Sequence, residues 1–338
     1  DYNDPEIVQA LLNEAKNIAK DEKSYTIKID PDIPAAGNES VIEYLKSLGF
    51  KHHGLTDGMS KDVIQPRTTM VTDVSLDDKA LLQSFERNNR TKVRNSLRAG
   101  TTVIKGKRDD LPDFVKLMKE TGERDGFLTR DISYFESLYE NLNPERHMEL
   151  FLVKLMPAEA SAALESDIAK VEKDINKAEK IKDEQKKRNQ LENLNNRMTK
   201  LNGQLEKMKE IESSHPEGVL LSGALYAQSG HKAYYLYGAS SNSYREFLPN
   251  HHMQWHMMQY ARAHGAVTYD FGGVSVEPDS EDEHFGLWQF KKVWGTEVSD
   301  KIGEFDYVTN RPLYTMAEVM FPVFQKGKMK LNKMLKRK

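Results

Sequence analysis

Two runs, Leu164–Ala178 (LESDIAKVEKDINKA) and Leu191–Ile211 (LENLNNRMTKLNGQLEKMKEI), decide how the rest of the chain is organised. Their apolar residues recur at alternating steps of three and four, the heptad pattern of helices that pack along one stripe. These residues are Leu164, Ile168, Val171, Ile175, Ala178, Leu191, Leu194, Met198, Leu201, Leu205 and Met208. Lys182–Arg188 (KDEQKKR), between the runs, carries no apolar residue. We therefore predict two helical arms of about 18 residues, each about 27 Å long, folded into an antiparallel coiled-coil hairpin.

The sequences on either side of the hairpin differ from it in kind. Met148–Leu155 (MELFLVKL) and Val219–Ala227 (VLLSGALYA) are apolar runs typical of strands. The hairpin is therefore predicted to be inserted between two neighbouring strands of one globular domain. Alternating helical and strand patterns elsewhere predict an α+β domain with a mixed sheet. Two interpretations of the hairpin stay open, a rigid spacer and a handle for a large partner.

The composition excludes several classes of protein. The chain has 338 residues, 38% of them apolar, a net charge of −3 and no cysteine. Disulfides, thiolate metal sites and a cysteine nucleophile are therefore excluded, and a cytoplasmic protein is expected. No run approaches the roughly 18 apolar residues of a membrane span, and no signal peptide is recognised. Because the chain opens at Asp1 and passes almost directly into a predicted helix, we expect an upstream part to be missing.

Positive charge is concentrated in two stretches. Arg87–Arg108 holds eight Lys or Arg and no acid, and a helix is predicted from Leu76 through Arg98. Four arginines of this helix are spaced by three and four residues and form a stripe: Arg87, Arg90, Arg94 and Arg98. The stripe could follow a phosphate backbone, and the alternative is a solvated surface. Lys326–Lys338 holds seven Lys or Arg and no acid. It fits a helix on an anionic membrane surface or a disordered basic end.

Two stretches offer candidate phosphate-binding side chains. Arg130 presents a planar fork of donors, and Tyr134, four residues later, is expected on the same helix face. The alternative is that Asp131 is an N-cap beside a surface arginine. In Lys232–Ser241, strand alternation places Tyr235 and Tyr237 on one face and Tyr234 on the other, which also suits ordinary strand aromatics.

The segment Gly286–Gly295 (GLWQFKKVWG) places Lys291 among three aromatic residues, Trp288, Phe290 and Trp294. A lysine held in such an apolar wall could offer its ammonium group to a developing oxyanion. The alternative is a lysine that extends along an amphipathic turn and keeps its charge in water.

Two acids and a histidine cluster complete the candidates. Asp30 follows a predicted strand and precedes a proline, and Glu304 lies in IGEFD. Both are candidate general bases, and the alternative for each is a cap or a solvated acid. His252 and His256 share a helix face, but Asp270 is the only further ligand with plausible spacing, so no metal site is predicted.

Taken in order, these motifs resemble the FemABX family of peptidoglycan aminoacyl transferases, in particular the FemA- and MurM-like members that carry a coiled-coil hairpin. The resemblance covers nearly the whole chain. It depends on the hairpin and on an ordered set of motifs: TIKIDPDIP, TKVRNSLRAG, GFLTRDISYF, YYLYGASS, TYDFGGVS, LWQFKKVWG and IGEFDYV.

The resemblance implies GNAT-like (acetyltransferase-like) subdomains and an activity. An amino acid (Gly, Ala or Ser) would pass from aminoacyl-tRNA to the stem-peptide amine of a lipid-linked or UDP-linked muramyl pentapeptide, building the interpeptide bridge of the cell wall. No metal or coenzyme is implied. Carried over by motif, the site residues are those for diphosphate binding (Arg130, Tyr134, Tyr237), transition-state stabilisation (Lys291 beside Phe290) and proton acceptance (Asp30, Glu304).

The resemblance also assigns the remaining parts. The hairpin and the basic helix would meet tRNA, and Lys326–Lys338 would touch the inner face of the membrane. Residues 1–64 would be the remainder of a first GNAT-like subdomain, whose upstream half contributes a diphosphate-binding lysine in the family. Residues 65–158 and 215–338 would form the second, interrupted by the hairpin at 159–214.

Two rival functions stay open from the sequence. One is an acyl-CoA N-acetyltransferase, which would need a glycine-rich pyrophosphate loop that the chain lacks. The other is a non-catalytic module that grips tRNA or a protein with the hairpin.

Overall fold

The structure, a computed structural model, describes residues 2–55, 65–143, 147–276, 278, 281–282 and 284–317. The basic tail Lys326–Lys338 lies outside the described residues. The chain divides into two compact units, each described here by itself. Unit 1 comprises Asp1–Met70, Gly273–Trp288 and Val298–Lys338, and unit 2 comprises Val71–Gly272 and Gln289–Glu297.

Unit 1 is built on a three-stranded antiparallel sheet in the order β1-β10-β2, formed by Thr26–Ile29, Phe305–Val308 and Lys51–His52. Helices α1 (Pro5–Asp21) and α2 (Glu39–Ser47) belong to it, and residues 311–317 are also helical. Its core contains Leu12, Ile33, Ile42, Leu45, Phe50, Ile302 and Phe305. The assignment of all of residues 215–338 to the second subdomain differs from this division, because β10 pairs with β1 and β2. The boundaries of the GNAT-like subdomains stay a prediction.

The larger sheet has seven strands in the order β4-β5-β6-β7-β8-β3-β9. Neighbours from β4 to β7 are antiparallel, and β7 and β8 are parallel. The predicted α+β class with a mixed sheet is thereby confirmed. In chain order the strands are β3 (Thr68–Asp73), β4 (Thr101–Gly106), β5 (Met148–Leu155), β6 (Val219–Ser229), β7 (Lys232–Ser240), β8 (Thr268–Gly273) and β9 (Glu297–Asp300).

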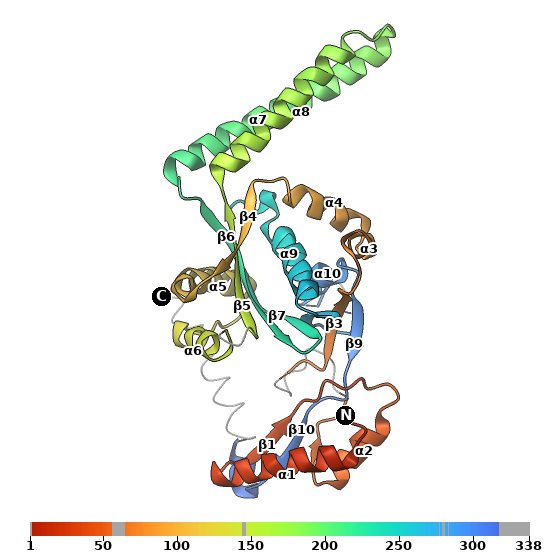
Figure 1. Ribbon diagram of the computed structural model, residues 1–338, viewed down its shortest axis with the longest axis vertical. Helices are drawn as coiled ribbons and strands as arrows, with labels where there is room; N and C mark the ends of the chain where they lie inside the picture. Colours follow the sequence, from red (N-terminus) through yellow and green to blue (C-terminus); the bar gives the residue numbers. More distant parts are fainter. Residues whose placement is uncertain are drawn as a thin grey trace. The chain divides into compact units, whose positions relative to one another are not determined.

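Helices cover both faces of this sheet. Figure 1 shows α5 (Leu111–Asp125) and α6 (Ile132–Leu142) on one face and α9 (Pro249–Ala263) on the other. The remaining short elements are α3 (Asp78–Ser84), α4 (Arg87–Ser96), α10 (Phe285–Lys292) and two 3₁₀ turns (Arg108–Asp110, Arg245–Phe247). Within the described ranges, no helix combines the length and the hydropathy needed to cross a membrane.

The predicted hairpin is present as two helices, α7 (Pro157–Ala178) and α8 (Glu184–Ser214), which run side by side in opposite directions (Figure 1). All the predicted stripe residues are buried or half-buried. The helices join β5 to β6, which are neighbours paired at Leu155 and Val219, so the predicted insertion is confirmed. Asp183 caps α8 by accepting a hydrogen bond from the Lys186 amide, so most of KDEQKKR is helical and the turn is shorter than predicted. Supercoiling of the pair stays a prediction.

The predicted continuous helix from Leu76 to Arg98 is wrong. The chain forms α3 and then α4, and Phe85 between them is extended, with φ −71° and ψ 154°. Phe85 is buried, and its ring lies 5.2 Å from that of Trp294 and 6.0 Å from that of Trp255. Burying this ring requires the backbone to leave helical geometry, which helical periodicity cannot reveal.

Candidate functional site

Arg130, Tyr134 and Tyr237 come together on the face of the sheet that α6 covers. The hydroxyls of Tyr134 and Tyr237 lie 2.8 Å apart, and the guanidinium carbon of Arg130 lies 5.2 Å from the centre of the Tyr134 ring. Asp131 caps α6 by accepting from the Tyr134 amide, so the cap predicted as the alternative is also present. Burial raises the pKa of Tyr237 to about 12, so its hydroxyl stays neutral and able to donate. The exposed Arg130 and the two phenols thus form a group of donors suited to phosphate oxygens.

The placement of Tyr235 and Tyr237 on one face of β7 is wrong. Tyr237 pairs with Leu225 and Tyr235 with Tyr226, so Leu236 is an extra residue in a β-bulge. A bulge reverses the alternation of side chains beyond it. Tyr237 therefore packs in the cluster beneath α6, whereas Tyr235 lies against Phe271 on the other face, 6.4 Å between ring centres.

Lys291 lies in the last turn of α10 and is only 5% exposed. Burial lowers its pKa to about 8, and the Asp270 carboxylate opposes that shift. The ring of Phe290 lies 6.2 Å from that of Trp294, which is fully buried. The alternative of a lysine that keeps its ammonium group in solvent is wrong, because the side chain is enclosed. A buried cation with a lowered pKa is suited to stabilise a developing oxyanion or to take part in proton transfer.

Sequence analysis missed the residues that accompany Lys291. Asp270, predicted only as a possible metal ligand, is fully buried within β8, and its Oδ2 lies 3.0 Å from the Nζ of Lys232. Its Oδ1 accepts a hydrogen bond from the Gly272 amide at 2.7 Å. The signal available was an acid and two glycines in the strand TYDFGG, which does not reveal what the acid faces.

Asp30 and Glu304 belong to unit 1 and have different surroundings. Burial raises the pKa of Asp30, an effect that Lys301 opposes and Glu304 reinforces. Glu304 is 3% exposed, and its Oε1 lies 2.6 Å from the Nζ of Lys28. The interpretation of Glu304 as a solvated acid is therefore wrong. Lys28 also contacts Asp306 at 2.6 Å, so one ammonium serves two buried carboxylates.

A group with metal-ligand types occurs beside this pair. Ligand atoms of His53, Glu304 and Asp306 all lie within 4.8 Å of one another. The Lys28 ammonium contacts both carboxylates, and His53 Nε2 lies 2.8 Å from Asp306 Oδ2, so each possible ligand already has a partner within the protein. These residues therefore fit a charge network better than an ion site.

The three histidines of α9 make separate contacts. His252 Nδ1 lies 2.8 Å from the Thr101 hydroxyl, and the ring of His256 lies 5.4 Å from that of Phe151. Burial lowers the pKa of His251 and His252 to about 4, so both are neutral at physiological pH. These contacts are those of packed side chains.

The arginine stripe is only partly a single helical face. Arg87, Arg94 and Arg98 are exposed, while Arg90 is half-buried and donates to the Gln83 carbonyl at 3.1 Å. Helix α4 ends at Ser96, so Arg98 lies beyond it. The structure thus leaves a short exposed basic surface whose binding to tRNA stays a prediction.

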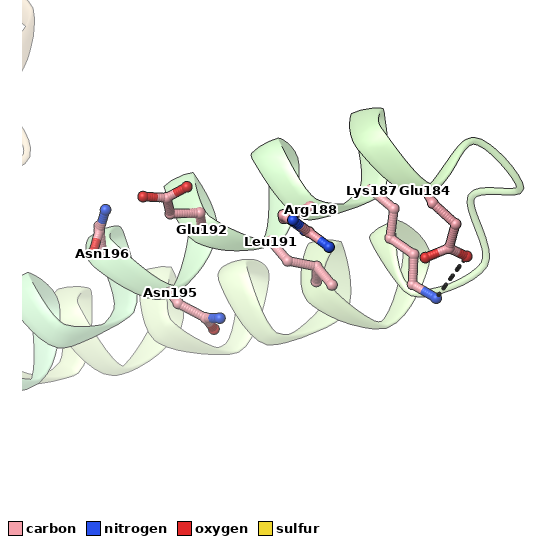
Figure 2. A pocket seen from close by; sticks show the side chains of 7 residues that line it. All are labelled: Glu184, Lys187, Arg188, Leu191, Glu192, Asn195 and Asn196. Atoms are coloured by element: carbon pink, nitrogen blue, oxygen red, sulfur yellow. Dashed lines mark ion pairs between the residues drawn. The ribbon is translucent and has the colours of Figure 1, made fainter.

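Figure 2 shows a hollow on the distal half of α8. An ion pair joins Glu184 and Lys187 at 3.9 Å. The hollow mixes acids, bases and amides and contains none of the candidate catalytic residues, so we do not take it as the site of chemistry. It is lined by Glu184, Lys187, Arg188, Leu191, Glu192, Asn195 and Asn196.

Comparison with known proteins places this geometry in context. A sequence profile of the FemAB family matches residues 1–321. The chain is 52% identical over 338 residues to the lipid II:glycine glycyltransferase of Staphylococcus epidermidis, covering 100% of this chain and 81% of that protein. It is 52% identical over 343 residues to the enzyme of the same name from Staphylococcus aureus strain USA300, covering 100% and 82%. The crystal structure of FemX matches with a TM-score of 0.81 and 52% identity over 94% of this chain and 80% of that one, which confirms the predicted fold class.

Proposed function

The chain belongs to the FemAB family, and from that premise we propose that it is an aminoacyl transferase that adds glycine to lipid II. Two relatives at 52% identity carry that substrate and that amino acid in their names. The observation that supports the chemistry is the presence, within unit 2, of the Arg130–Tyr134–Tyr237 group and the buried Lys291. The first suits the acceptor's diphosphate and the second suits acyl transfer.

The proposed reaction is the attack of an amine on an ester carbonyl. The amine of the acceptor forms the new C–N bond, the carbonyl oxygen becomes negatively charged in the tetrahedral intermediate, and the ester C–O bond then breaks. The proton lost by the amine is ultimately matched by the proton gained by the leaving hydroxyl. The Lys291 ammonium stabilises the oxyanion, and no protein nucleophile is required.

Two acids are proposed as the proton acceptor, and their surroundings favour Asp30. A raised pKa brings a carboxylate closer to the pH at which it must accept a proton, as burial does for Asp30. Glu304 is held by Lys28 at 2.6 Å, which favours a structural role. Asp30→Asn should lower transfer with little change in stability, and Glu304→Gln should lower stability first. The reverse pattern in parallel rate and urea-unfolding measurements would contradict this choice.

The donor is proposed to be glycyl-tRNA, and the alternatives are tRNA charged with alanine or with serine. Exposed Arg87 and Arg94 on α4 supply positive charge that fits a nucleic acid. The acceptor is proposed to be lipid-linked, which is the form in the names of the relatives.

The test is transfer of radiolabelled glycine, alanine or serine from charged tRNA to lipid II, with the UDP-linked pentapeptide as a second acceptor. We expect glycine on lipid II to give the fastest transfer. Arg130→Lys keeps the charge but loses the planar fork, so it should raise KM for lipid II about tenfold with little change in kcat. Binding of tRNA without transfer from any donor would favour the non-catalytic module.

A further inference from the structure

The carboxylate of Asp270 is fixed from two sides. It is fully buried within β8. Its Oδ1 accepts the Gly272 amide at 2.7 Å, and its Oδ2 lies 3.0 Å from the ammonium of Lys232 on β7, whose side chain is 16% exposed. A carboxylate held through both oxygens has little freedom to rotate, so its negative charge stays in a constant position.

The backbone of β8 at Gly272, which Asp270 accepts from, lies against the Lys291 ammonium. Gly272 has φ +81°, in the left-handed region that glycine favours, and a Cβ built on it would lie 3.6 Å from Lys291 Nζ. The backbone at Gly272 thus approaches the end of the Lys291 side chain, and the Asp270 charge acts on that ammonium.

Two titratable groups that pack against Trp294 and Phe271 are neutral over the useful pH range. His251 of α9 lies against the Trp294 ring at 5.5 Å, and burial lowers its pKa to about 4. Tyr235 of β7 lies against Phe271, and burial raises its pKa to about 12. Lys292, next to Lys291, is an exposed cation, whose charge water screens.

We propose that Asp270 is a positioning residue for Lys291, and that Lys232 sets how much of the Asp270 charge reaches the Lys291 ammonium. The inference extends the proposed function, in which Lys291 stabilises the oxyanion. Asp270 would keep Lys291 protonated in an apolar enclosure, and Lys232 would moderate that effect by sharing the carboxylate.

The proposal predicts opposite effects of two substitutions. Asp270→Asn removes the anion but keeps an oxygen for the Gly272 amide, so the pKa of Lys291 should fall by about one unit. Lys232→Gln removes the competing cation, so the pKa should rise by about half a unit. The alkaline limb of kcat/KM for glycine transfer should move in the same two directions. A merely structural role would give losses of rate with no opposed shifts.

The experiment measures labelling of Lys291 by acetic anhydride as a function of pH, by peptide mass spectrometry, in the full chain without substrates. Midpoints that move in opposite directions support the proposal, and unmoved or same-direction midpoints overturn it. If Asp270→Asn does not fold, Lys232→Gln decides alone, and the lack of an alkaline shift overturns the proposal. If the two variants shift the midpoint in opposite directions but the wild-type chain transfers no glycine, the coupling stands and the proposed function fails. If the wild-type chain transfers glycine but neither variant shifts the midpoint, the proposed function stands and the coupling fails.

Discussion

Lys28 in unit 1 and Lys291 in unit 2 both interact with buried carboxylates, but Lys28 is exposed and Lys291 is enclosed, and their pKa values shift in opposite directions. Burial would lower the pKa of Lys28, but hydrogen bonds and charge from Asp306 and Glu304 raise it. Burial lowers the pKa of Lys291 to about 8, opposed by the Asp270 carboxylate, which Lys232 also contacts. The carboxylates available to each ammonium thus distinguish Lys28, with a structural role, from Lys291, the lysine that we propose to be reactive.

The largest expected effect comes from removing the reactive lysine. Lys291→Met should lower glycine transfer about 10²- to 10³-fold, because an oxyanion loses its fixed cation. Thermal stability should change little, because an apolar side chain replaces the buried ammonium while Asp270 keeps its contact with Lys232. Lys292→Met, at the exposed neighbour, is the matched control and should keep near-normal rates. Equal losses of transfer rate in Lys291→Met and Lys292→Met would contradict a special role for Lys291.

Removing the structural lysine should affect folding instead. Lys28→Met leaves the carboxylates of Glu304 and Asp306 buried without their ammonium, which should cost about 3 kcal/mol of unfolding free energy in urea. Lys46→Met is the control, because its pair with Glu43 is exposed and worth less than about 1 kcal/mol. A stable Lys28→Met protein without transfer activity would make Lys28 a catalytic residue and remove the distinction.

The pH dependence of stability sharpens the comparison. The pKa of Lys291 is about 8 in the folded protein, against an ordinary value of 10.5. Between these values the unfolded chain binds the proton that the folded chain has lost, so this group makes stability rise with pH. The wild type should therefore gain about 2 kcal/mol relative to Lys291→Met between pH 8 and pH 10. Parallel unfolding curves for the two proteins would show that the buried amine stays charged.

Cations in open solvent should contribute least. Arg87→Gln combined with Arg94→Gln should weaken tRNA binding several-fold and reduce the slope of log K against log salt by roughly two, because each exposed charge releases counterions. Lys116→Gln combined with Lys119→Gln on α5 is a control of equal charge. A similar change of slope in both pairs would assign binding to net charge and not to α4.

The features that sequence predicted are those set by local periodicity. The heptad stripe from Leu164 to Met208 specified both helices of the hairpin and their contact face, because a helical face is repeated within a few residues. Arg130 and Tyr134 are also close in sequence, but the expected shared helix face is wrong, because Arg130 precedes the N-cap Asp131 and lies outside α6. Periodicity does not predict contacts between parts of the chain that are distant in sequence.

Three features show where sequence prediction failed. The bulge at Leu236 reverses the face of β7 and separates Tyr235 from Tyr237, and an inserted residue leaves no mark on a tyrosine-rich strand. The bend at Phe85 exists because its ring packs against Trp255 and Trp294. The pairing of Lys28 with Asp306 depends on the register of β1 and β10, which the strand sequences do not fix.

The position of the hairpin between Leu155 and Val219 has a consequence for protein engineering. These residues are register partners on adjacent strands, so the hairpin acts as one long loop that joins β5 to β6. The entropic cost of closing a loop rises only slowly with its length. Ala160, Met208 and Ile211 belong to the core at its base, so a cut should be made beyond them. A trimmed hairpin, joined above that base by a short turn, should leave the rest of unit 2 folded and separate the role of the arm from that of the catalytic residues.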